Sequence, residues 1–125
     1  MPEPDERWAR GTAAYASQFR IGEDEVFARL AGTIGERMAT EAINAAGGAW
    51  ADDDVLSLRE RSLVVVAALV AQGGVDARLR GHVGWALDHG VSSEELEAAL
   101  ALLAIYVGYP RASVAMEVVR EVLED

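Results

Sequence analysis

The sequence of 125 residues contains no cysteine and no lysine, and each absence excludes a class of chemistry. Without cysteine the chain forms no disulfide, thiolate metal site or iron–sulfur cluster, and cysteine-based redox catalysis is excluded. Without lysine, a Schiff-base mechanism on a lysine amine is excluded as well. Any reaction that the protein catalyses must therefore use other side chains.

Long hydrophobic runs and basic clusters are also missing. No stretch reaches the ~18 apolar residues of a membrane-spanning helix, and the charged segment 1–10 has no apolar signal region. The formal net charge is −10, and the eleven basic residues, all arginine, form no basic block. Binding to nucleic acid needs cations against the phosphates and is therefore disfavoured. We expect a cytoplasmic protein that binds neither nucleic acid nor membranes.

Apolar residues, by contrast, are in excess. Hydrophobic residues make up 51% of the sequence, and the chain also has 12 glycines. Together they exceed the apolar content of about 45–50% that is usual for a globular domain. The length fits a single domain over residues 1–125, and obligate subunit interfaces resemble a domain core. We therefore expect one domain that assembles as a homo-oligomer.

Apolar periodicity predicts an all-α fold of five or six helices. Residues 1–22 are expected to be a weakly ordered region that includes a weak helix over 6–19. A repeat of apolar residues at three- and four-residue steps predicts one amphipathic helix over 24–45, followed by a glycine pair that ends it. Residues 50–55 contain three aspartates and are predicted to be a loop.

Capping residues define the helices of the second half. Ser57 with Glu60, and Ser92 with Glu95, form two capping boxes, in which the serine oxygen accepts from a first-turn amide and the glutamate reaches back to the cap. Gly90 has the position that usually follows a helix. The helices predicted from these signals cover residues 58–72, 75–89, 93–107 and 110–123.

The segment 79–90, LRGHVGWALDHG, points most strongly to function. Helical spacing places Arg78, His82 and His89 on one face of its helix. Imidazole titrates near neutral pH, and most other residues of this helix are small or apolar. The segment therefore predicts a packed pocket that contains one titrating group.

Three blocks of this sequence resemble the carboxymuconolactone decarboxylase family, the larger group that includes the alkylhydroperoxidase D type proteins. Residues 56–64 are similar to a helix opening, residues 79–90 to the L-x-x-H-x-x-x-A-L-x-x-G block, and residues 104–110 to a turn with tyrosine, glycine and proline. Their order and spacing agree over residues 50–123. The resemblance implies an all-helical alkylhydroperoxidase D-like fold that assembles as a trimer or hexamer.

The resemblance also distinguishes which of the family's functions this chain can have. The peroxidase branch has a C-x-x-C ahead of the histidine, and those positions hold Val75 and Arg78 here, so a cysteine peroxidase is excluded. The proton-relay glutamate of that branch falls near Ser62. The family reading is therefore a decarboxylase with no metal and no cofactor, acting on 4-carboxymuconolactone or a related lactone or keto acid.

Decarboxylation of such a substrate needs a cation for its carboxylates, a donor for the developing enolate and an acid for carbon. In this hypothesis His82 is the proton donor, Arg78 binds a carboxylate or the oxyanion, and Arg61 and Tyr109 also bind substrate. The charge of Arg78 opposes protonation of His82. A dianion also requires a locally positive field, since the chain is acidic. Four arginines of neighbouring helices are expected to supply it: Arg59, Arg61, Arg78 and Arg80.

Each of these residues also has a structural interpretation. His82 fits a core histidine bonded to backbone, Arg78 an ion pair with another subunit, and Trp85 simple packing. The phenol of Tyr109 fits a hydrogen bond to backbone at the turn, and His89 is expected to be a cation at a helix end. The competing hypothesis for the whole protein is a non-catalytic homo-oligomer, either a small-molecule-binding protein or an inactive paralogue.

Overall fold

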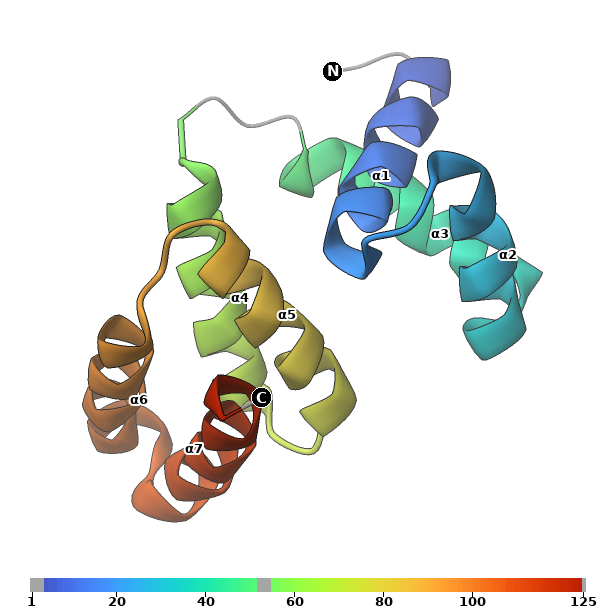
Figure 1. The fold of residues 1–125 in the computed structure, drawn as a ribbon. Coiled ribbons are helices and arrows are strands. Elements are labelled where there is room, and N and C mark those ends of the chain that lie inside the picture. Colours follow the sequence, from blue (N-terminus) through green and yellow to red (C-terminus); the bar gives the residue numbers. More distant parts are fainter. Residues whose placement is uncertain (1–3, 52–54, 125) are drawn as a thin grey trace. The chain divides into compact units, whose positions relative to one another are not determined.

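The computed structural model describes residues 4–51 and 55–124, and the regular elements in these ranges are helical (Figure 1). Seven α-helices and one π-helical turn follow one another along the described chain. Their contacts divide the chain into two compact units, Met1–Val55 and Leu56–Asp125. The all-α prediction is confirmed, and each unit is described by itself.

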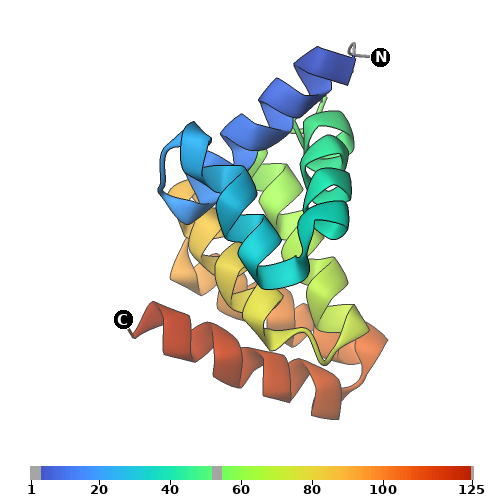
Figure 2. The same cartoon turned by 90° about the vertical axis from the view of Figure 1, so that its right-hand side faces the viewer.

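The first unit consists of three helices and a π-helical turn. The helices are α1 (Pro4–Phe19), α2 (Glu23–Ile34) and α3 (Glu36–Ala45), and the turn covers Ala46–Trp50. All three helices contact one another (Figure 2). The fully enclosed side chains between them are aliphatic: Val26, Leu30, Ala39 and Ile43. The predicted helix over 6–19 is present as α1.

The prediction of one helix over 24–45 is wrong, because the helix breaks at Gly35. This glycine has φ 83° and lies between the end of α2 and the start of α3. A positive φ is accessible to glycine at little cost and ends an α-helix. The extra break raises the number of α-helices in the described residues above the five or six expected. Gly47 and Gly48 lie within the π-helical turn, and the aspartates 52–54 lie outside the described residues.

Glycine also permits a contact between backbones in the first unit. A Cβ atom built on Gly11 of α1 would overlap the carbonyl oxygen of Ile43, and one built on Gly47 would overlap that of Arg7. The end of α3 and the π-helical turn therefore approach α1 more closely than any side chain at these two positions allows.

The second unit consists of four helices whose bounds agree with the predicted ranges to within one residue. They are α4 (Leu58–Gln72), α5 (Asp76–Asp88), α6 (Ser93–Val107) and α7 (Tyr109–Leu123). Both predicted capping boxes are confirmed. Glu60 N–H donates to Ser57 Oγ at 3.1 Å and Ser57 N–H to Glu60 Oε1 at 2.9 Å, and the Ser92 box has the same pattern at 3.0 Å.

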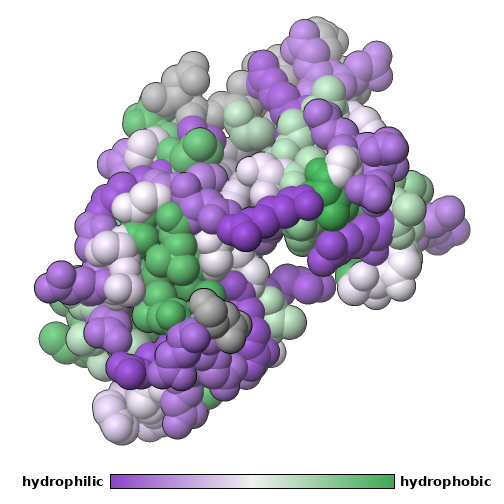
Figure 3. Space-filling view, viewed as in Figure 1, coloured by the Kyte–Doolittle hydropathy of each residue, from purple (hydrophilic) through white to green (hydrophobic). Residues whose placement is uncertain are grey.

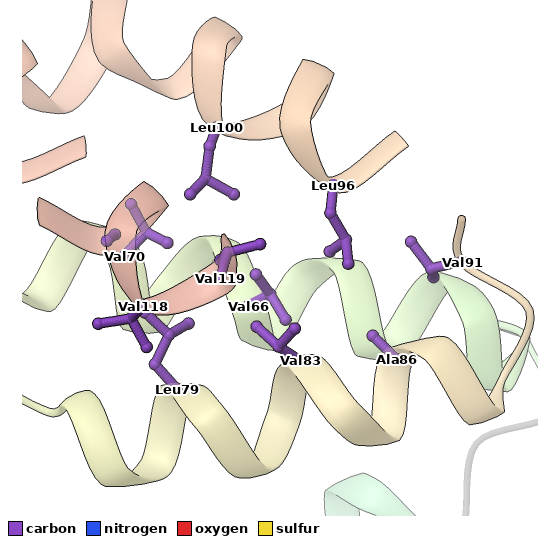
Figure 4. Close-up of a cluster of buried hydrophobic side chains, with 11 residues drawn as sticks. Val66, Val70, Leu79, Val83, Ala86, Val91, Leu96, Leu100, Val118 and Val119 are labelled. Carbon is purple, nitrogen blue, oxygen red and sulfur yellow. The ribbon is translucent and has the colours of Figure 1, made fainter. Parts of the chain in front are cut away.

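Aliphatic side chains from all four helices form the core of the second unit (Figure 4). Val66 and Val70 of α4 face Leu79 and Val83 of α5, while α6 and α7 contribute further leucines and valines. The helical start signal thus prevails over the strand preference of the valines in α4. Helix α5 packs against both α4 and α7. Its apolar residues therefore lie in the core, and its polar residues lie next to the core.

Exposed apolar side chains gather on α6 and the first half of α7. They are between 54% and 79% exposed and comprise Leu102, Ile105, Tyr106, Tyr109 and Val114. Figure 3 shows an apolar area on one face of the second unit, among polar residues. None of the helices in the described ranges is long and apolar enough to cross a membrane.

Candidate functional site

Two imidazoles flank a buried indole along α5. The ring centroid of Trp85 lies 6.0 Å from that of His82 and 4.9 Å from that of His89, with interplanar angles of 52° and 47°. Trp85 is 6% exposed. The three residues share one helical face, as their spacing predicts, and we call them the α5 histidine row.

A hydrogen bond joins the end of this row to α4. Ser62 Oγ lies 2.7 Å from His89 Nδ1, and Ser62 is 1% exposed. The bond ties the first turns of α4 to the carboxyl end of α5. Ser62 continues the buried stripe of Val66 and Val70 at four-residue steps, and a hydroxyl on such a stripe needs a partner. That stripe is the signal that could have identified this pair in the sequence.

Burial is the main influence on the protonation of His82. It lowers the pKa of the imidazole, and the charge of Arg78 lowers this pKa further. The Nδ1 atom is shielded from solvent. His82 is therefore neutral at neutral pH, and the predicted effect of Arg78 on it is confirmed.

The pKa of His89 is also lowered, chiefly by burial. The charge of Arg61 lowers this pKa as well, whereas Asp88 and a backbone hydrogen bond with Leu58 raise it. The neutral imidazole is favoured, so the prediction of a helix-end cation at His89 is wrong.

Two of the four arginines expected to form a positive cluster are paired with carboxylates. Arg59 pairs with Glu95 of α6, and Arg80 pairs with Glu121 of α7 at 2.8 Å. These carboxylates offset two of the four charges. Both pairings join residues far apart in the sequence, which local spacing does not predict.

Arg61 and Arg78 act on different ends of the histidine row. Arg61 Nε donates to the carbonyl of Leu56 at 2.9 Å, which holds the side chain at the start of α4, and its charge acts on His89. Arg78 is exposed on α5 and acts on His82. Each histidine therefore has one cation in its electrostatic surroundings.

Tyr109 begins α7 and is 74% exposed. Two residues later, Arg111 donates to the carbonyl of Ala71 at the end of α4. Tyr109 therefore belongs to the end of the unit where α4 finishes, whereas the Ser62–His89 bond lies near the start of α4. The structure does not bring Tyr109 to that pair.

The histidine row offers imidazoles of low pKa beside guanidinium groups. A protonated imidazole of low pKa is a stronger acid than free histidine, and a guanidinium binds carboxylate. Within the described ranges, no group of three or more histidine and acidic side chains is placed to hold a metal ion. The chemistry open to these residues is proton transfer to a bound anion.

Replacing Ser62 by alanine is expected to lower the free energy of unfolding by about 1–2 kcal/mol, because a partner of the part-buried Nδ1 of His89 is removed. Urea denaturation followed by circular dichroism measures the change. Ser113→Ala is the matched control, since the Ser113 hydroxyl bonds the carbonyl of Pro110 at 3.0 Å on an exposed turn. Equal losses in both variants contradict a special role for the Ser62–His89 bond.

Comparisons with known proteins agree with the sequence blocks. Residues 38–121 match the carboxymuconolactone decarboxylase family. A segment of 65 residues is 37% identical to the 4-carboxymuconolactone decarboxylase of Acinetobacter baylyi, covering 52% of this chain and 48% of that protein. A segment of 56 residues is 45% identical to peroxisomal protein 2 of Saccharomyces cerevisiae, covering 45% of this chain and 19% of that protein. The matched segments span less than half of each relative.

Proposed function

The chain belongs to the carboxymuconolactone decarboxylase family, and on this premise we propose that it is a cofactor-independent decarboxylase of 4-carboxymuconolactone or a related carboxylated lactone or keto acid. The observation that carries the proposal within the structure is the half-buried His82, whose Nδ1 is shielded from solvent and whose pKa is lowered by burial and by its cationic neighbour Arg78. This pairing supplies an acid and an anion-binding group on one helical face.

The proposed reaction breaks the bond between a ring carbon and its carboxylate. Carbon dioxide leaves, and the electron pair spreads through the conjugated double bond onto the lactone carbonyl oxygen. A proton then adds to carbon and gives the enol-lactone. Each turnover consumes one proton, so the protein must bind the carboxylates, stabilise the enolate oxygen and supply an acid.

His82 is the proposed acid, and substrate binding prepares it. A carboxylate bound at Arg78 offsets the guanidinium charge and adds a negative charge near the imidazole, so it raises the pKa of His82. The histidine takes up a proton as the substrate binds and delivers it to carbon after carbon dioxide has left. Arg78 is the proposed carboxylate-binding group.

The remaining candidates have supporting roles in this proposal. The Ser62–His89 bond holds the end of α5 against α4 and so orients the face that carries His82. Arg61 provides a second positive charge near His89 for the other carboxylate of a dianion. Tyr109 is left out, because it lies at the far end of the unit.

The direct test is to incubate the purified protein with 4-carboxymuconolactone and follow loss of substrate and appearance of the enol-lactone. The proposal requires enol-lactone formation above the rate in buffer. A folded protein that binds the lactone without converting it overturns the proposal and favours the non-catalytic binding protein.

The pH dependence of turnover is expected to report the protonation state of His82 directly. Only the protonated imidazole donates, so kcat/KM falls as pH rises through the pKa of His82 in the free protein, which lies below the ordinary value of about 6.5. The value of kcat reports the substrate complex, in which the pKa is higher, and so falls at higher pH. Steady-state rates across this range measure both profiles. Profiles that coincide, or that rise with pH, contradict the mechanism.

We also propose that the chain assembles as a homo-oligomer through the exposed apolar face of α6. Obligate subunit interfaces are apolar in the same way, because they resemble a domain core cut in half. Light scattering at micromolar concentration is expected to give a mass of at least three chains, and Ile105→Glu is expected to reduce it. Val64→Glu on α4 is the matched control, since Val64 is 58% exposed and Ile105 is 77% exposed. A wild-type monomer contradicts this proposal.

A further inference from the structure

The second unit contains a pocket that the proposed decarboxylase does not use. It has a volume of about 660 Å³ and opens where α4 ends and α5 begins, within the range of roughly 300–1,000 Å³ typical of small-molecule sites. One part of its wall is aliphatic and includes Leu69, Val70, Leu79, Val107 and Val114, and another part of the lining is polar or backbone. Neither histidine of the α5 row lines it.

Arg111 of α7 is the cation of this pocket. Its Nη1 donates to the carbonyl of Ala71 at 2.7 Å, and its stem crosses Gly73, where an added Cβ would lie 3.0 Å from Nε. The guanidinium is thus held in place by backbone. Among the described residues it has no carboxylate partner in an ion pair, and arginine carries five N–H donors in all.

Asp76 also lines the pocket, but its charge is offset within its own helix. It lies in the first turn of α5, where the helix dipole stabilises a carboxylate. Arg111 bonds to a backbone carbonyl and not to a carboxylate among the described residues, so the pocket combines aliphatic side chains with a guanidinium group.

We propose that this pocket binds a small aliphatic carboxylate, with its chain along the wall and its carboxylate on Arg111. The proposed catalytic residues do not line this pocket, since the lining residues of α5 are Asp76 and Leu79, and Val75 belongs to the turn before α5. Residues of the turn before α5 line the pocket, so an occupant that binds only the folded protein stabilises the second unit.

Octanoate is the probe, with octan-1-ol, octylammonium and acetate as comparisons. Titration calorimetry measures affinity, and amide NMR locates the site. Octanoate is expected to bind most tightly and to shift amides of residues 69–79 and 107–115. Equal affinity for octylammonium, or shifts confined to other residues, overturns the proposal. Acetate binding as tightly as octanoate overturns the role of the aliphatic wall.

Variants of Arg111 distinguish the effect of its charge on binding from an effect on folding. Arg111→Gln is expected to weaken octanoate binding about tenfold, the usual effect of losing a charged hydrogen bond, whereas Arg111→Lys keeps the positive charge and most of the affinity. Arg120→Gln, an exposed arginine on the same helix outside the pocket, is expected to leave affinity unchanged. Unaltered binding to a folded Arg111→Gln protein overturns the proposal.

A second pair of variants tests the wall without touching the charge. Val114→Trp fills the mouth of the pocket and is expected to abolish octanoate binding. Val64→Trp changes a similarly exposed valine on α4 that does not line the pocket, and binding is expected to persist. Circular dichroism confirms that both proteins fold. Binding that survives Val114→Trp places octanoate elsewhere and overturns the proposal.

Discussion

Replacing His82 by glutamine is expected to lower kcat for decarboxylation of 4-carboxymuconolactone by about 10²–10⁴-fold, the contribution typical of a positioned general acid. Glutamine keeps a polar side chain of similar length but cannot deliver a proton in the neutral pH range. Steady-state kinetics of enol-lactone formation measure the loss. Turnover at the wild-type rate removes His82 from the mechanism.

Two arginine variants distinguish chemistry from general damage. Arg80→Gln changes an exposed side chain paired with Glu121 and is expected to leave kcat unchanged. Arg78→Gln is expected to raise KM, because the carboxylate-binding group is lost. It also removes a charge that lowers the pKa of His82, so the decline of kcat/KM moves to higher pH. An unshifted pH profile contradicts the coupling of these two residues.

Replacing Gly47 by alanine is expected to lower the free energy of unfolding by about 3 kcal/mol or more, at the upper end of overpacking effects. The atom in the way is the backbone carbonyl oxygen of Arg7. A side chain could rotate aside, but a backbone carbonyl of α1 moves only with its helix. Urea denaturation followed by circular dichroism measures the loss.

Gly32 provides the matched control for this substitution. It lies within α2, and a Cβ atom added there meets nothing within 4 Å. Gly32→Ala is expected to stabilise the protein by about 0.5–1 kcal/mol, because alanine loses less backbone freedom in a helix. If Gly47→Ala is as stable as Gly32→Ala, the close approach of the π-helical turn to α1 is refuted.

Local signals predict the second unit well. Ser57 and Ser92 each mark a helix start through hydrogen bonds that span three residues, and Gly73 and Gly108, both with positive φ, end α4 and α6. Such signals act within one turn of the chain, so the sequence alone contains the cause and the effect.

Features that depend on residues far apart in the sequence are harder to predict from the sequence alone. The break at Gly35 could not be predicted, because the apolar repeat continues in register from α2 into α3. Ser62 and His89 are 27 residues apart, and only the packing of α4 on α5 brings them together. The pairing of Arg59 with Glu95 has the same origin, and the sequence analysis did not predict it.

The indole of Trp85 lies between two imidazoles and is therefore an intrinsic fluorescent probe of their protonation. Protonated imidazole quenches the fluorescence of an adjacent indole, and Trp85 lies 4.9 Å from one imidazole and 6.0 Å from the other. The remaining tryptophans, Trp8 and Trp50, belong to the other unit. Emission from position 85 therefore registers proton uptake along α5 without any attached dye.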